Sequence, residues 1–179
     1  GDVRLEAGTT LTVTNVNAGT GHVSLLAGTG SILDGGDTLT DVVASTLRMS
    51  AGGGIGTLGA GANALETSVA TLSGRAGSGG IHILQVTGLT LGSTSATVGQ
   101  VGSTGLAPHL ADGPQSGLAT TSSGSIVVRT TAGALSVELG DGVAADGSGN
   151  VLLQAGGASS ILTVSSAVCT ARPSSGSTV

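Results

Sequence analysis

A short phrase of two apolar residues separated by one position recurs along this chain and limits the folds open to it. A glycine turn follows each pair, and a second apolar residue or pair comes about eight to eleven residues after the first. The first pairs, each given with the second apolar residue or pair that follows it, are Val3/Leu5 with Leu11/Val13, Val23/Leu25 with Ile32, Ile81/Ile83 with Leu89/Leu91, Ile126/Val128 with Leu135/Val137, and Val151/Leu153 with Leu162/Val164. Side chains alternate between the faces of a strand, so each pair predicts a short strand with one buried face. Their regular recurrence predicts an all-β parallel β-helix, or β-solenoid.

The separations between successive phrases set the expected number of coils. We take six residues as equivalent first-strand positions, and their successive separations are 20, 24, 34, 45 and 25 residues. These residues are Val3, Val23, Leu47, Ile81, Ile126 and Val151. The separation of 45 corresponds to two coils if Leu106–Leu118 forms an irregular one. A coil of roughly 20–25 residues predicts about seven or eight short coils in a single unit spanning residues 1–179.

The chain has no Phe, Tyr or Trp, so the core must be built from Val, Leu, Ile and Ala. Aromatic side chains each bury roughly 150–250 Å² in ordinary globular cores, and a core without them is better suited to a thin column. The alternative fold is an immunoglobulin-like sandwich. That fold needs longer alternating strands and normally a buried aromatic residue, and this chain offers neither.

Two segments depart from the repeating phrase. A polar loop insert is expected near 102–123, where two of the three prolines lie, and a linker-like tail is expected near 170–179. The stretches with the strongest tendency to disorder are Gly102–Gly117 and Pro173–Val179, because apolar pairs lapse there. Asp41–Ser50 and Ala64–Leu72 have apolar residues at mixed spacing. In Ala64–Leu72 the Ser, Thr and Val residues are poor helix formers, so we expect a strand there, with a short helical turn as the alternative.

Part of the chain resembles a repeat found in very large bacterial surface and secreted proteins, the filamentous-haemagglutinin-like β-strand-repeat proteins. The resemblance rests on LRMSAGGGIG (Leu47–Gly56), ALETSVATL (Ala64–Leu72) and GGIHIL (Gly79–Leu84). The flanking phrases Gly21–Gly30 and Gly149–Gly156 are similar to the glycine-bounded coils of that family. The resemblance implies export, a right-handed parallel β-helix, and a role in adhesion, a sheath or a fibre, with no catalytic residues. The proline-bearing insert at 102–117 and the lack of a secretion domain depart from the family pattern.

Charge and hydropathy exclude two classes of partner. The formal net charge is −5, and the five cationic residues are all Arg, so no basic stripe can neutralise nucleic-acid phosphates. No apolar run approaches the roughly 20 residues that a membrane-spanning helix needs. We therefore expect neither nucleic-acid binding nor membrane insertion. The start at Gly1-Asp2 shows no signal peptide and is expected to mark a fragment or a processed product.

The resemblance and the open ends of any solenoid lead to a structural hypothesis. Both ends of an uncapped solenoid expose unpaired strand edges and apolar core, which favours stacking. We expect a structural or adhesive unit of a secreted or cell-surface fibre that pairs with itself, head to tail or in a tandem array. The alternative is a module on a β-helix scaffold that binds surface glycans or host proteins.

Calcium is the one metal that the sequence brings into consideration. Asp34-Gly35-Gly36-Asp37 is similar to the glycine–aspartate turns of calcium-binding β-rolls, although the nonapeptide period of those rolls is absent. Asp34, Asp37 and Asp41 place three carboxylates within eight residues, and calcium prefers such oxygen ligands. Turn residues chosen for backbone conformation explain the same pattern, so our expectation is no metal or cofactor, with calcium at these three aspartates as the alternative.

The remaining chemistry-bearing residues do not form a recognisable site. Glu6, Glu66 and Glu138 are far apart in sequence, and we cannot assign the facing carboxyl pair that a glycosidase needs. The histidines His22, His82 and His109 lack a cysteine or carboxylate at zinc-site spacing and are expected to be solvated. Cys169 has no second cysteine and is expected to be a half-buried apolar residue beside Val168, with an intermolecular disulfide as the alternative. We therefore expect no enzymatic activity.

Overall fold

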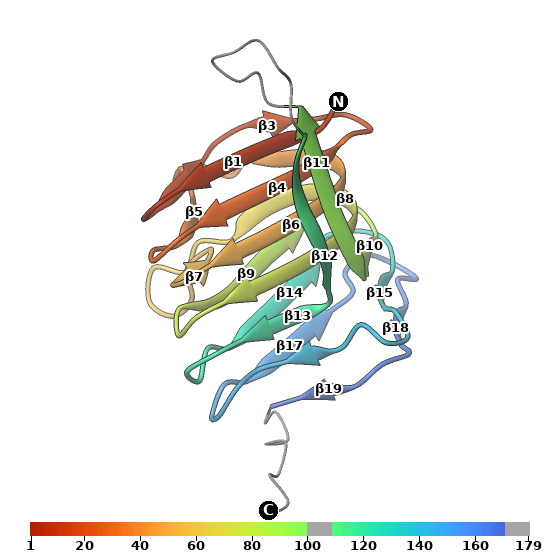
Figure 1. Ribbon diagram of the computed structural model, residues 1–179. Helices are drawn as coiled ribbons and strands as arrows, with labels where there is room; N and C mark the ends of the chain where they lie inside the picture. Colours follow the sequence, from red (N-terminus) through yellow and green to blue (C-terminus); the bar gives the residue numbers. More distant parts are fainter. Residues whose placement is uncertain (100–108, 171–179) are drawn as a thin grey trace, which may run out of the picture.

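The computed structural model describes residues 1–99 and 109–170, in which all regular secondary structure is β. Short strands are stacked along a single axis, with the N-terminal coil at one end and the C-terminal coil at the other (Figure 1). The strands are β1 (Val3–Ala7), β2 (Leu11–Val13), β3 (Val16–Asn17), β4 (His22–Ala27), β5 (Ile32–Asp34), β6 (Val42–Ala51), β7 (Gly54–Ile55), β8 (Leu65–Ala76), β9 (Gly80–Gln85), β10 (Leu89–Leu91), β11 (Ser93–Gly99), β12 (His109–Ser116), β13 (Leu118–Thr120), β14 (Ile126–Thr130), β15 (Leu135–Val137), β16 (Val143–Ala144), β17 (Val151–Gln154), β18 (Leu162–Val164) and β19 (Val168–Cys169).

Seventeen of the described strands form one continuous sheet in which each coil pairs in parallel with the coils beside it. Equivalent residues of successive coils lie directly opposite one another, so that like packs on like. One such column consists of Val3, Val23, Leu47, Leu72, Leu91, Val137 and Val164. These are seven stacked levels, and they confirm an all-β parallel β-helix.

A second column corrects the expected equivalence of the coils. It consists of Leu11, Ile32, Ile55, Ile81, Ile126 and Val151. Val3, Val23 and Leu47 therefore do not share a column with Ile81 and its successors. The 34 residues from Leu47 to Ile81 span about one and a half coils. Both columns use the same motif of an apolar pair bounded by glycine, so the sequence pattern does not show which column a pair belongs to.

The insert expected as a loop contains a hairpin. Strands β11 and β12 pair antiparallel, and β13 then rejoins the stack, so the expected loop at 102–123 is wrong for residues 109–120. The 45 residues between Ile81 and Ile126 are one coil with this hairpin inserted, and not two coils. The register of the hairpin shifts between Thr94 and Ala96, opposite Gly113 and Pro114. Pro114 thus lies at a bulge, where a strand tolerates proline, and this makes it a misleading loop signal.

Parts of two sequence-based expectations fall outside the described residues. The first residues of the expected loop insert, 102–108, belong to the stretch 100–108, and most of the expected linker-like tail belongs to the stretch 171–179. The tendency to disorder expected for Pro173–Val179 is therefore untested. For residues 109–117 the same expectation is wrong, because β12 occupies most of that range.

The hairpin runs across the strands of the stack and packs on the outer side of β4, β6 and β8 (Figure 1). Polar contacts attach it to the first coils. Arg4 Nε lies 2.9 Å from Asp112 Oδ2, and Arg48 Nε donates to the Gly113 carbonyl at 3.1 Å. Gln115 Nε2 donates to the Met49 carbonyl at 2.8 Å. The hairpin therefore ties the N-terminal coils together along the axis of the helix.

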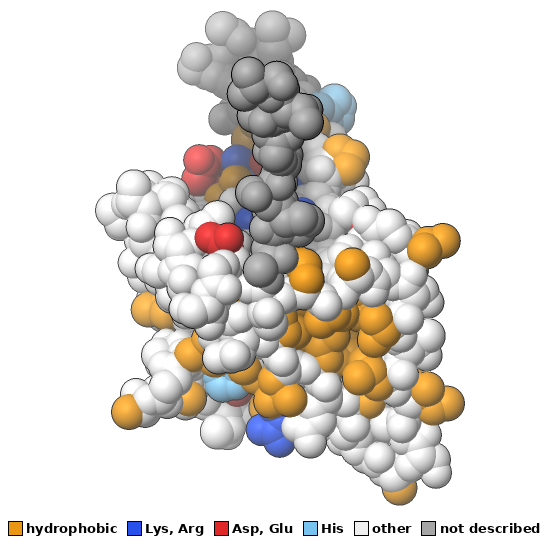
Figure 2. Space-filling model, turned by 90° about the horizontal axis from the view of Figure 1, so that it is seen from below, with side chains coloured by type: hydrophobic (Ala, Val, Ile, Leu, Met, Phe, Trp, Pro, Cys, Tyr) orange, Lys and Arg blue, Asp and Glu red, His pale blue; other side chains and the backbone are white. Residues whose placement is uncertain are grey.

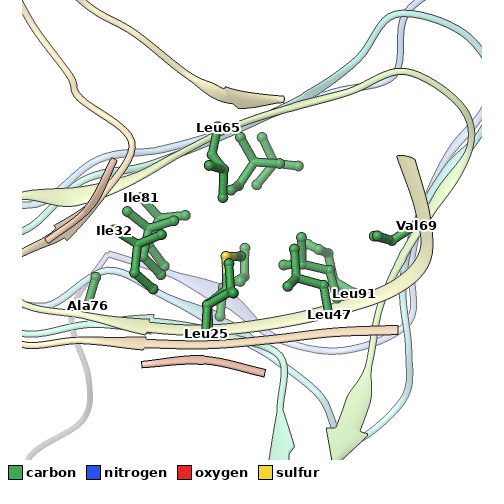
Figure 3. Close-up of a cluster of buried hydrophobic side chains, with 14 of the residues drawn as sticks. Leu25, Ile32, Leu47, Leu65, Val69, Ala76, Ile81 and Leu91 are labelled. Carbon is green, nitrogen blue, oxygen red and sulfur yellow. The ribbon is translucent and has the colours of Figure 1, made fainter. Parts of the chain in front are cut away.

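The core is a narrow column of aliphatic side chains enclosed by the coils (Figure 3). Leu25, Ile32, Leu47, Met49, Ile55, Leu65, Leu72, Ile81, Ile83, Leu91, Leu118 and Ile126 are its largest fully buried members. The expectation that small branched residues replace aromatics in a thin core is confirmed. The segment Ala64–Leu72, for which a strand is expected, lies largely within β8, and Asp41–Ser50 lies largely within β6.

Glycines form a column of their own at one corner of the helix. Gly8, Gly28, Gly52, Gly77, Gly124 and Gly149 follow one another in successive coils, each packed against the backbone of the one before. A Cβ at Gly28 or at Gly52 would come 2.5 Å from the carbonyl oxygen of the preceding glycine in the column. Real Cβ atoms do not approach so closely, so this corner requires glycine. The glycines of this column therefore reflect close coil-to-coil approach.

Candidate functional site

Three carboxylates from different parts of the chain meet at one corner of the helix. Asp34 ends β5, Asp41 immediately precedes β6, and Glu66 lies near the start of β8. One oxygen of each lies within 4.8 Å of one oxygen of each of the others. The chain leaves Asp34 through a turn at Gly36, whose φ of 94° requires glycine, and returns at Asp41. The Asp41 amide donates to the Glu66 carbonyl at 2.9 Å, which places the two acids in neighbouring coils.

Hydrogen bonds fix two of these carboxylates through one oxygen each. Asp34 Oδ2 accepts from the Gly36 amide at 2.9 Å and from Asn63 Nδ2 at 2.5 Å. Asp41 Oδ2 accepts from the Glu66 amide at 2.9 Å. Backbone donors thus hold the acids in position, and hydrogen bonds of this charge-assisted kind are among the stronger ones in proteins.

Each of the three acids also has one oxygen that is buried without a hydrogen-bond partner. These oxygens are Asp34 Oδ1, Asp41 Oδ1 and Glu66 Oε2. The exposed fractions of Asp34, Asp41 and Glu66 are 8%, 0% and 8%. A buried polar group without a partner is costly, and a buried unpaired charge is more so. Three buried acids that each have such an oxygen, and whose carboxylates lie within 4.8 Å of one another, therefore require a compensating positive group or a proton.

The pKa values of two acids reflect this crowding. Burial raises the pKa of Asp41 to about 7, and the negative charges of Asp34 and Glu66 add to the effect of burial. Burial also raises the pKa of Glu66, and the charge of Asp34 raises it further. The cluster therefore resists holding three negative charges at once, which is the electrostatic condition that a bound cation relieves.

The structure brings together two of the three aspartates considered as calcium ligands and adds a residue that the sequence does not suggest. Asp37 is exposed and accepts from the Leu39 amide at 2.7 Å, as expected for a turn residue. Glu66 takes its place in the cluster. Glu66 lies 25 residues after Asp41, which is one coil length, so the coil period is the signal that could have identified it.

The other candidate residues are not gathered into a site. His22 Nδ1 lies 2.8 Å from Thr46 Oγ1, and His82 Nδ1 donates to the Thr57 carbonyl at 2.8 Å. His109 is exposed at the start of β12, and not in a loop as expected. Glu6 pairs with Arg4 at 2.6 Å, while Glu138 is exposed. Cys169 is half-buried in β19 beside Val168, as the sequence predicts.

The C-terminal end of the described helix is an apolar surface (Figure 2). Leu162, Val164 and Val168 occupy positions whose neighbours one coil earlier are buried, and they are 42%, 49% and 40% exposed. The neighbours in register, Leu135, Val137 and Val143, are at most 1% exposed. The described residues thus end on a level of core side chains on which no other described strand is stacked.

A hollow of about 560 Å³ lies beside β8, β13 and β16 and is lined by residues that include Arg75, Ser116 and Thr120. Its polar groups are used within the fold. Arg75 donates to the carbonyls of Gly74, Ser116 and Gly117, and Thr120 donates to the Gly124 carbonyl. The hollow therefore offers a prospective ligand few uncommitted polar groups.

In the described parts of the chain, no helix has the length and apolar character to cross a membrane. Comparisons with protein-family models, with curated proteins and with solved structures gave no match.

Proposed function

We propose that this chain is a structural unit of a secreted or cell-surface fibre, in which successive units stack end to end along the axis of the β-helix. The observation that carries the proposal is the apolar end formed by Leu162, Val164 and Val168. The strands at this end have a parallel neighbour on one side, and no other described strand pairs with their outer edge. Apolar core and an unpaired strand edge together favour continuation of the helix.

The N-terminal end has the matching composition. The first coil presents Val3, Leu5, Leu11 and Val16, which are only partly buried against the core. Val3 and Val164 belong to the same column, so a second copy placed in register would continue a line of aliphatic side chains. We therefore propose another copy of this chain as the occupant of the open end.

The cellular setting follows from the resemblance to bacterial surface repeats and is part of the proposal. Two features of the chain support this setting. Charged residues make up only 8% of the sequence, and nearly all described strands pair in parallel with strands of the neighbouring coils. Such a scaffold gives length and rigidity without a catalytic centre. An adhesive or sheath role is the form of function that this architecture serves best.

The proposal is tested by sedimentation velocity of the 179-residue chain over a wide concentration range, with electron microscopy of the same samples. We expect concentration-dependent elongated species. Leu162→Glu should abolish them because it places a charge in the stacked interface. Leu139→Glu is the control, because Leu139 is 85% exposed and does not belong to the apolar end surface. A wild-type chain that stays monomeric at the highest attainable concentration would overturn the proposal.

Glycan or host-protein binding is the second candidate, and the hollow beside Arg75 is the feature that bears on it. Because the polar groups that line the hollow already form hydrogen bonds within the fold, the hollow is weaker support for ligand binding than the apolar end is for assembly. Saturable binding of a glycan by a chain that does not assemble would favour it. We therefore retain assembly as the proposed function.

A further inference from the structure

We infer that Asp34, Asp41 and Glu66 form a calcium site. This inference concerns a ligand, and it is independent of the assembly proposed above. A failure of calcium binding would leave assembly untouched, and a monomeric chain could still bind calcium.

The spacing of the oxygens suits a single ion. Calcium–oxygen distances are about 2.3–2.6 Å, so two ligands on opposite sides of one ion lie about 4.8 Å apart. One oxygen from each of the three acids falls within 4.8 Å of the other two. A single ion can therefore contact all three carboxylates with little movement of the backbone.

The state of these oxygens is the second and independent observation. Asp34 Oδ1, Asp41 Oδ1 and Glu66 Oε2 are buried, and no hydrogen-bond donor reaches them. Water-exposed acids would be satisfied by solvent, but these residues are at least nine-tenths buried. An ion held by the three carboxylates would compensate for these missing hydrogen bonds and would neutralise the mutual repulsion of the acids.

The donor set selects the class of metal. Carboxylate oxygens suit hard cations such as Ca²⁺ and Mg²⁺, whereas zinc sites favour His and Cys, which are absent from this cluster. Mg²⁺ needs near-ideal octahedral geometry at about 2.0–2.1 Å, while Ca²⁺ accepts irregular arrangements of six to eight oxygens. Asp34 and Asp41 are each held by hydrogen bonds through Oδ2, so they cannot rearrange freely to fit a small ion. The larger and more tolerant ion is favoured.

The position of the site defines what calcium would do. Asp34 and Asp41 belong to one level of the helix and Glu66 to the next, at the end of β5, just before β6 and near the start of β8. The ion would join these two levels at the corner where the exposed turn 35–39 leaves the stack. Calcium would therefore stabilise the N-terminal half of the β-helix against local opening, as ligands that bind only the folded state do.

The experiment uses the full chain, dialysed against EDTA and returned to chelator-free buffer. Calcium chloride is then added in isothermal titration calorimetry and in thermal unfolding. We expect one ion bound per chain and a rise in the midpoint of unfolding of about 5–10 °C at a hundredfold excess over the dissociation constant. Absence of both a binding heat and a thermal shift at millimolar calcium would overturn the inference.

Matched variants locate the site. Glu66→Gln keeps the shape of the side chain and removes its charge, and we expect it to abolish the calcium response. It should fold, because it relieves repulsion in the cluster, and its unfolding midpoint in EDTA should equal or exceed that of the wild type. Asp37→Asn lies in the same turn but outside the cluster, and it should keep the full response.

Three further outcomes would contradict the assignment. A calcium response that persists in Glu66→Gln would place the site elsewhere, and loss of the response in Asp37→Asn would show that the turn and not the cluster binds the ion. Magnesium chloride serves as the comparison ion at equal concentration. Binding of magnesium as tight as that of calcium would contradict the choice of calcium.

Discussion

Gly52 packs against Gly28 of the neighbouring coil so closely that a Cβ at position 52 would lie 2.5 Å from the Gly28 carbonyl oxygen. Neither residue has a positive φ, so the reason for glycine here is contact between coils and not backbone conformation. The same relationship recurs from coil to coil along one corner. The glycine content of the chain is thus partly a packing requirement of the stack.

Gly52→Ala should destabilise the fold by about 1–3 kcal/mol, because the added methyl group must push two coils apart. Gly8→Ala is the matched control, since Gly8 occupies the same column but no heavy atom lies within 4 Å of the position that its Cβ would take. We expect Gly8→Ala to change the free energy of unfolding of the monomer by less than about 0.5 kcal/mol. Urea denaturation followed by circular dichroism measures both. Equal losses from the two variants would contradict the proposed packing role.

Ile126→Ala should cost about 2–4 kcal/mol, because Ile126 is fully buried between Ile81 and Val151 in the second column. Leu162→Ala tests the end of the stack, where the side chain is 42% exposed, and should cost less than about 1 kcal/mol in the monomer. Chemical denaturation at low protein concentration measures the loss in the free energy of unfolding for both variants. If truncation at the end cost as much as truncation in the middle, the described end would not be open.

The raised pKa of Asp41 predicts a pH-dependent stability in the absence of calcium. Its folded-state pKa of about 7 lies above its ordinary value of 3.8, so the folded state holds a proton that the unfolded state releases between these values. The contribution to stability is therefore fully present below about pH 4 and is lost as the pH rises to about 7. Each unit of pKa difference corresponds to about 1.4 kcal/mol. Asp34 and Glu66 face the same carboxyl and strengthen the effect.

Comparison with Asp41→Asn isolates this contribution, because other acids titrate in the same range. Denaturation in EDTA from about pH 4 to about pH 8 should show a wild-type stability that falls relative to that of the variant as the pH rises. Added calcium should reduce the difference at the upper end of the range. Parallel profiles for the two proteins would show that Asp41 does not titrate as described.

The fold class is predictable from sequence because pairs of branched residues and glycine turns are repeated at nearly constant spacing. The sequence does not predict which residues of successive coils lie in register. Ile81 begins an apolar pair close after Gly80, much as Val23 does two residues after Gly21, yet Ile81 and Val23 occupy different columns. Only the pairing partners distinguish the columns, and these depend on the lengths of the intervening turns. The hairpin escapes prediction because Pro114, which lies at its bulge, is more often a sign of a loop.

The carboxylate cluster is predictable only in part. Asp34 and Asp41 are close in sequence, so both are predicted as candidate oxygen ligands. The same reasoning also adds Asp37, which is exposed. Glu66 joins them through stacking of one coil on another, a relationship that composition and local motifs do not contain. The burial that distinguishes these acids from ordinary turn residues likewise arises only in the folded chain.

End-to-end stacking in register makes one further geometric prediction. Glu6, Leu26, Ser50, Arg75, Ala119, Ala144 and Cys169 follow one another as partners from the first coil to the last. If a second copy continues the helix, its Glu6 lies beside Cys169 of the first. Neighbouring strands are about 4.8 Å apart, which is within the range of Cα separations that a disulfide can bridge.

The most direct measurement is therefore non-reducing electrophoresis of Glu6→Cys after mild oxidation. We predict a ladder of disulfide-linked multimers that disappears when Cys169 is also replaced by Ser, and no comparable ladder for Leu139→Cys, whose side chain is exposed away from this register. If Glu6→Cys remains monomeric under oxidation, or cross-links no better than Leu139→Cys, the chain does not stack end to end in register, and the proposed role as a fibre unit is contradicted.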